Sequence, residues 1–184
     1  MWLSEVTKDF ENLGKYTFLW YLRVLLRIDS NGALLLFRTL QFLNKKKGFF
    51  YRVLYRVFND RYNKVCGYLN LSLSPITSIG SGVVFPHGFP LVINSATKIG
   101  KNCIIHPCVL IGRDRGKDGA PVIGNNVFVG NGAKIIGNPC IGDWCFISPG
   151  AVITKNIPAN SVVGFGLNNI INGDGKIHVE MYQK

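Results

Sequence analysis

Residues 73–153 decide the fold, and they read LSPITSIGSGVVFPHGFPLVINSATKIGKNCIIHPCVLIGRDRGKDGAPVIGNNVFVGNGAKIIGNPCIGDWCFISPGAVI. A bulky apolar residue returns in this stretch at a spacing of six, at Leu73, Ile79, Phe85, Ile93, Ile99, Ile105, Ile111, Ile123, Val129, Ile135, Ile141, Ile147 and Ile153. A small, mostly apolar column lies four places later, at Val83, Thr97, Cys103, Val109, Val127, Ala133, Cys145 and Ala151. Residues 85–91, which hold two extra positions, and the polar, glycine-rich residues 113–121 interrupt the repeat.

A period of six fits neither an amphipathic helix, at about 3.6 residues, nor a simple strand, at about 2. It is the signature of a β-helix, in which short strands and turns coil around one axis and stacked coils bury two inward columns. Glycine often follows the bulky residue, as at Gly80 and Gly100, where we expect a corner that needs a permissive backbone. The alternative is coincidental alternation in a sandwich of strands.

The 184 residues, 47% hydrophobic, divide into three predicted regions. Residues 1–70 form an α-helical N-terminal region, residues 71–160 the β-helix, and residues 161–184 an irregular C-terminal tail. In the first region, the apolar spacing from Phe18 to Leu26 predicts a helix. A second helix, capped by Asp29, Ser30 or Asn31, ends near residues 45–48, and a third covers 49–65.

Positive charge gathers in the N-terminal region. Residues 1–70 hold 12 Lys and Arg against 5 Asp and Glu, out of a net charge of +11 for the whole chain. Arg52, Arg56 and Arg61 form a basic stripe, which favours either contact with an anionic membrane surface or a solvated helical cap over one end of the β-helix. Nucleic acid is a weaker candidate, because no recognition motif accompanies the dispersed basic residues.

The chain shows neither a secretory signal nor an apolar run of membrane-spanning length. Its five cysteines are odd in number and lack metal-ligand spacing. Cys103 and Cys145 fall on the small inward column, where a thiol acts as a small hydrophobe. We therefore expect a reduced cytoplasmic protein, with peripheral contact at the inner membrane face, and no metal site.

The interruptions of the repeat are the natural places for function. His87 stands in the first, between two prolines that restrict the loop, and histidine is suited to accept a proton near neutral pH. His106 follows Ile105 at an outward corner, and His178 lies in the polar tail, where a function is not expected. A nucleophilic Cys108 is the rival mechanism, although no base pattern accompanies it.

About half of the chain resembles the left-handed parallel β-helix (hexapeptide-repeat) acyltransferases, and within them the serine acetyltransferase group. The resemblance rests on IGSG at 79–82, the insertion with His87, VGNGAKIIGN at 129–138, ISPGAVITK at 147–155, and Ile157-Pro158. It implies an all-β left-handed parallel β-helix with an α-helical N-terminal segment. It further implies an acetyl-CoA-dependent O-acetyltransferase acting as a homotrimer, with each active site between neighbouring β-helices.

The same resemblance implies that His87 is the catalytic general base. It assigns the CoA groove to four positions: Asn131, Pro149, Thr154 and Lys155. No metal enters this chemistry.

Three positions depart from the serine acetyltransferase pattern. An aspartate is missing from residues 71–75 (LSLSP), a histidine before Pro121 is replaced by Ala120, and the usual C-terminal motif is replaced by GLNN at 166–169. With His87-Gly88 followed by LVIN at 91–94, they favour the capsular and exopolysaccharide O-acetyltransferases of the colanic-acid type. The predicted acceptor is therefore a sugar hydroxyl of a polysaccharide or its lipid-linked precursor.

The first alternative is a serine O-acetyltransferase of cysteine biosynthesis. A catalytically silent β-helix scaffold and an N-acetyltransferase of an amino sugar are the others.

Overall fold

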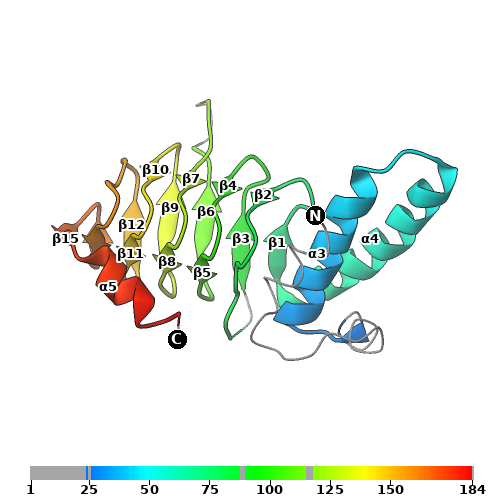
Figure 1. Ribbon diagram of the computed structural model, residues 1–184, viewed down its shortest axis with the longest axis horizontal. Coiled ribbons are helices and arrows are strands. Elements are labelled where there is room, and N and C mark those ends of the chain that lie inside the picture. Colours follow the sequence, from blue (N-terminus) through cyan, green and yellow to red (C-terminus); the bar gives the residue numbers. More distant parts are fainter. Residues whose placement is uncertain (1–23, 25, 88–89, 115–117, 184) are drawn as a thin grey trace.

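The computed structural model describes residues 24, 26–87, 90–114 and 118–183. An elongated β-helix carries a pair of helices at its N-terminal end and a short helix near its C-terminal end (Figure 1). The prediction of a parallel β-helix with a helical N-terminal segment is confirmed. The division of the chain into domains stays a prediction.

Three sheets run along the axis, and successive coils add strands to each. Sheet A contains β1 (Leu71–Leu73), β3 (Leu91–Ile93), β6 (Leu110–Gly112), β9 (Lys134–Ile136), β12 (Ala151–Ile153) and β14 (Gly166–Leu167). Sheet B contains β2 (Ser78–Ile79), β4 (Lys98–Ile99), β7 (Val122–Ile123) and β10 (Cys140–Ile141). Sheet C contains β5 (Ile104–Ile105), β8 (Phe128–Val129), β11 (Phe146–Ile147), β13 (Val162–Val163) and β15 (Ile170–Asn172). The paired strands are parallel, except that β15 runs antiparallel to β13.

The six-residue columns form the core. In sheet B, Ile99 pairs with Ile79 on one side and with Ile123 on the other. Every bulky position of the repeat is at most 7% exposed, and the small column, Cys103 and Cys145 included, is at most 1% exposed. Burial of both columns in every coil explains why the sequence repeats at six.

The glycines that follow the bulky residues serve close packing between coils. A Cβ built on Gly80 would lie 2.6 Å from the backbone of Gly100, and one on Gly100 would lie 2.4 Å from the carbonyl oxygen of Gly124. Neither glycine has a positive φ. The expected reason, a permissive backbone, is therefore wrong here, because the coils approach too closely for any side chain.

Two antiparallel helices, α3 (Ser30–Asn44) and α4 (Phe49–Leu69), pack at the β1 end. The predicted cap is confirmed, since the Asp29 side chain accepts a hydrogen bond of 2.8 Å from the Gly32 N–H. The phenol of Tyr62 on α4 donates to the carbonyl of Leu73, at 2.8 Å. One continuous apolar cluster joins these helices to the β-helix core. The first predicted helix lies almost wholly outside the described residues.

The C-terminal segment is more regular than predicted. After β13 and β14, β15 turns back along β13, and helix α5 (Gly175–Glu180) packs against sheet C. Val179 is fully buried there against Ile104 and Phe128. The expectation of an irregular tail is wrong. Sheet C carries apolar side chains on its outer face, and this segment folds over them and removes them from water.

Within the described residues, no helix combines the length and apolar character needed to cross a bilayer.

Candidate active site

His87 lies where the chain passes from sheet C to sheet A. It follows Val84, which pairs with Ile104 in sheet C, and it precedes β3 of sheet A. Its side chain is exposed and its φ is +61°, a left-handed conformation that histidine tolerates better than most residues. The end of this loop is held to the next coil, because the Cys108 N–H donates a hydrogen bond to the Pro90 carbonyl.

A second imidazole, missed as a partner by the sequence analysis, lies beside His87. The ring centroids of His87 and His106 are 6.0 Å apart and the rings are inclined by 45°. His106 also contacts Phe128, with a centroid separation of 4.9 Å. Partial burial, followed by the charge of His87, lowers the pKa of His106, so this ring stays neutral at neutral pH.

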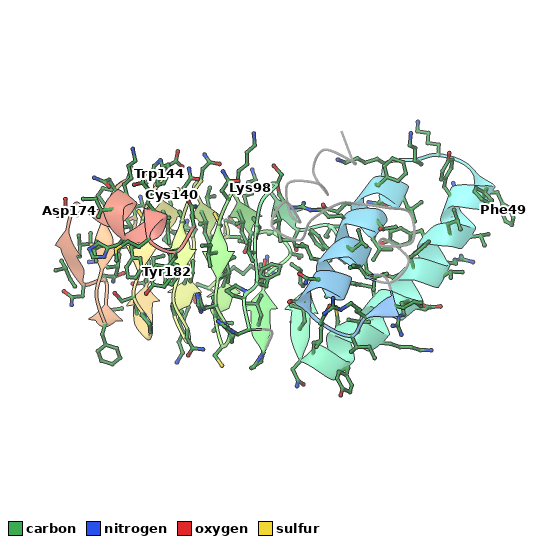
Figure 2. The ribbon with its side chains drawn as sticks, turned by 60° about the horizontal axis from the view of Figure 1, so that its bottom comes forward. Phe49, Lys98, Cys140, Trp144, Asp174 and Tyr182 are labelled. Atoms are coloured by element: carbon green, nitrogen blue, oxygen red, sulfur yellow. The ribbon has the colours of Figure 1, made fainter. Side chains whose placement is uncertain are left out.

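The row of rings continues away from His87 along sheet C. Phe128 stacks on Phe146, with ring centroids 4.6 Å apart. Tyr182, which lies just beyond α5 (Figure 2), contacts Phe128 with a centroid separation of 4.4 Å. His178 contacts Phe146 at 5.3 Å, at the far end of the row from His87. His87, His106, Phe128 and Phe146 follow one another after 19, 22 and 18 positions, close to the length of one coil, and this spacing is the sequence signal that could have indicated their row.

Asn131 and Pro149 share the edge of the β-helix that carries His87. Each stands in a turn from sheet C to sheet A, and both are exposed. These turns stack through backbone hydrogen bonds, since the Gly132 N–H donates to Pro107 and the Gly150 N–H donates to Asn131. With coils about 4.8 Å apart, His87 and Pro149 are separated by three coils, or about 14 Å along the axis.

Thr154 and Lys155 lie at the opposite edge of sheet A. Strand β12 separates Pro149 from Thr154, so the four predicted CoA residues divide between two edges. The Asn168 side chain accepts hydrogen bonds from the backbone N–H groups of Thr154 and Lys155, at 2.7 and 3.2 Å. Both side chains are exposed, and no ion pair of Lys155 is found among the residues that the structure describes.

The segment that lacks the aspartate forms part of a shallow groove of about 370 Å³ on sheet A. Ser72 lies on its wall with Val92, Asn94 and Arg113, and none of the described lining residues is acidic. Among the described residues that line the groove, Arg113 is the one cationic side chain. The groove extends toward the edge that follows β3 and β6, whereas His87 precedes β3 and does not line it.

The cysteines fall into two groups. Cys66, Cys103 and Cys145 are buried, and burial raises the pKa of the Cys66 and Cys103 thiols to about 11. Cys108 and Cys140 are exposed. In the described part of the chain, no group of three or more His, Cys, Asp or Glu side chains could hold a metal ion.

This architecture defines a class, the hexapeptide-repeat acyltransferases. The family model for bacterial transferase hexapeptide (six repeats) matches residues 120–155. A serine acetyltransferase of Helicobacter pylori is 33% identical over 141 residues, which are 75% of this chain and 78% of that protein. The chain belongs to the serine acetyltransferase family, and it is an acetyl-CoA-dependent acyltransferase.

Solved structures show the same fold. The serine acetyltransferase from Brucella abortus in complex with coenzyme A has a TM-score of 0.70 at 22% identity, covering 93% of this chain and 66% of that one. The serine acetyltransferase of Neisseria gonorrhoeae in complex with serine has a TM-score of 0.65 at 25% identity, covering 89% and 66%.

These comparisons confirm the predicted class and co-substrate and correct the predicted acceptor. The polysaccharide O-acetyltransferase prediction, with its colanic-acid affinity and glycan acceptor, is wrong, because the relatives and neighbours are serine acetyltransferases. It rested on the local departures around Ser72, Ala120 and residues 166–169, whereas the similarity to the H. pylori enzyme extends over 141 residues. Differences at a few positions do not outweigh a match of that length.

Proposed function

We propose that this protein transfers the acetyl group of acetyl-CoA to the hydroxyl of L-serine, with His87 as general base. The observation that carries the proposal is the 33% identity with a serine acetyltransferase over three quarters of the chain. His87 supports it further, as an exposed imidazole on a loop tied to the adjacent coil by the Cys108–Pro90 hydrogen bond.

The chemistry needs one base. The His87 imidazole takes the proton of the serine hydroxyl while that oxygen attacks the thioester carbonyl of acetyl-CoA. The tetrahedral intermediate then expels the CoA sulfur, which takes the proton from the imidazolium, so that O-acetylserine and CoA leave and His87 is neutral again. A thiolate leaves without a strong acid, which is why no second acidic group is required.

We assign CoA to the surface that runs from Asn131 and Pro149 to Thr154 and Lys155. Gly132 fits this use, because a Cβ there would meet no atom within 4 Å and the turn is open to a ligand. Lys155 provides an exposed cation for a phosphate at the far edge. An extended substrate is needed to contact both edges of sheet A.

We also propose that the active enzyme is a homotrimer. A site shared by neighbouring β-helices accounts for the position of the assigned groups on outer edges of the chain, with His87, Asn131 and Pro149 all exposed. The mass of the protein in solution, measured by light scattering, tests this directly: three chains support the proposal and a stable monomer opposes it.

A second proposed activity, peripheral contact with anionic lipid, rests on the tip of the α3–α4 hairpin. Phe49 and Phe50 are 83% and 68% exposed at the start of α4, and Phe49 lies at the outer end of the molecule (Figure 2). Three exposed lysines, Lys45, Lys46 and Lys47, precede them. Apolar rings flanked by ammonium groups suit the boundary between headgroups and acyl chains.

Sedimentation with vesicles tests this contact. We expect binding to phosphatidylglycerol-containing vesicles at low salt, loss of binding in F49S/F50S, and no effect of Phe165→Ser, which removes a 78% exposed ring near the C-terminal end. Equal sedimentation of all three proteins, or none with any vesicle, overturns the contact. If the wild type self-associates and F49S/F50S does not, the tip instead contacts a second copy of the chain.

The acceptor is tested by thiol release from acetyl-CoA with L-serine, D-glucose or a deacetylated exopolysaccharide, with mass spectrometry of the product. The proposal expects O-acetylserine with L-serine alone. Turnover of a sugar and none of L-serine would overturn it.

A further inference from the structure

We infer that His106 is a positioning residue, whose neutral imidazole orients His87 and accepts a hydrogen bond from it when His87 becomes protonated. This inference rests on the proposed role of His87 as general base. It adds a residue and a function that the family comparison does not assign.

The His87 and His106 rings lie close to each other. The two ring centroids are 6.0 Å apart, a separation that a side-chain rotation or one bridging water closes to a hydrogen bond. The backbone holds the pair in register, because the Ile105 N–H donates to Val84, before His87, and the Cys108 N–H donates to Pro90, at the end of the His87 loop. The two histidines are thus kept on adjacent coils although 19 positions separate them in the sequence.

Packed aromatic rings support the His106 ring. Its ring contacts Phe128, which is 3% exposed and stacked on Phe146 with an interplanar angle of 6°. Tyr182 contacts both phenylalanines. A ring supported on its far side by a packed row of aromatic rings can fix the orientation of the exposed ring beside it.

Charge also favours a pairing of the two imidazoles. Within the described residues, no carboxylate forms an ion pair with His87, and the one other imidazole near the row, His178, contacts Phe146 instead. Tyr182 contacts Phe128 and Phe146, so His87 is the titratable group that faces His106. A neutral His106 can accept the N–H of the His87 imidazolium formed as the serine hydroxyl loses its proton. Stabilising that cation makes His87 a stronger base.

Two substitutions separate the hydrogen bond from the packing. His106→Phe keeps a ring against Phe128 and removes the nitrogen acceptor, whereas His106→Gln keeps a polar acceptor. We expect His106→Phe to lower kcat/KM about 10- to 100-fold, the usual effect of losing a hydrogen bond to a charged group. The KM for acetyl-CoA should hardly change, and the acidic limb of the kcat/KM profile should move to lower pH. His106→Gln should recover part of the rate.

The decisive readout does not need activity. NMR titration of the His87 ring, in the intact protein, should give a lower pKa in His106→Phe than in the wild type. An unchanged His87 titration together with an unchanged pH profile overturns the inference, and His106→Gln decides the matter if His106→Phe fails to fold. A shifted His87 titration in a protein that does not acetylate serine would instead overturn the proposed function and leave the pairing intact.

Discussion

The Arg38 guanidinium of α3 donates a hydrogen bond of 2.7 Å to the Ile79 carbonyl, at the end of β2. It also donates to the neighbouring Gly80 carbonyl, and the Arg38 side chain is 1% exposed. A buried cation is therefore held by backbone carbonyls of the first coil, and it joins the helical hairpin to the β-helix.

Removing this cation should loosen the hairpin. We expect Arg38→Met to lower the free energy of unfolding by about 1–3 kcal/mol, because two carbonyls lose their buried donor. Denaturant unfolding checks this, with Arg56→Met, on the exposed side of α4, as the control. Equal stability of the two variants would show that the Arg38 contacts contribute little.

Close coil packing predicts opposite effects for two glycine substitutions. Gly100→Ala should destabilise the protein by at least about 1–3 kcal/mol, because its Cβ would meet the backbone of Gly124. Gly67→Ala, in α4, should stabilise it by about 0.5–1 kcal/mol, since nothing lies within 4 Å of the new Cβ. Thermal unfolding of both variants measures the difference. A stable Gly100→Ala protein would contradict the close approach of the coils.

The thiols should differ in reactivity. Cys108 and Cys140 are exposed, whereas Cys66, Cys103 and Cys145 are buried. The Cys103 sulfur lies 3.2 Å from the Gly124 carbonyl oxygen. We expect a thiol reagent at mildly alkaline pH to modify the two exposed thiols in the native protein and all five after denaturation. Cys108→Ser should keep its activity, and loss of turnover in that variant would support the cysteine nucleophile instead.

Stability should depend on pH through His106. The folded state lowers the pKa of this ring, so just below the ordinary histidine value the unfolded chain binds more protons. The stability that the neutral His106 ring contributes to the folded state is present above that value. It is lost as the pH falls toward the pKa of His106 in the folded protein. We expect Tm to fall less in His106→Phe than in the wild type between about pH 7 and pH 5. Parallel profiles for the two proteins would contradict the lowered pKa.

The sequence predicts the β-helix well because its core has a fixed period. Each inward position, from Leu73 to Ile153, must place an apolar side chain in the core of its coil, so the pattern alone locates the buried columns. It also makes His87 a candidate base, because the insertion that holds His87 between two prolines interrupts that period. The acceptor was predicted wrongly, since departures at positions such as Ala120 change local chemistry without naming a substrate.

The remaining features depend on contacts between coils. His87 and His106 lie side by side because one coil of the β-helix separates them. The insertion that carries His87 changes the length of that coil, so the regular repeat does not predict the pairing. Helix α5 has six residues, too few for a reliable apolar pattern, and it is placed by Phe128 and Phe146, which face outward from sheet C. Pro149 and Lys155 lie at opposite edges of sheet A because strand β12 runs between them, and this separation likewise becomes clear only in the structure.

The central claim is that His87 is the general base of serine acetylation. Its most direct test is thiol release from acetyl-CoA with L-serine, comparing the wild type with His87→Ala and with His178→Ala, whose imidazole lies against Phe146 at the other end of the aromatic row. We expect His87→Ala to lose about 10²- to 10⁴-fold in kcat, the usual contribution of a positioned base, while His178→Ala keeps its turnover. A folded His87→Ala protein that acetylates serine at the wild-type rate would contradict the claim.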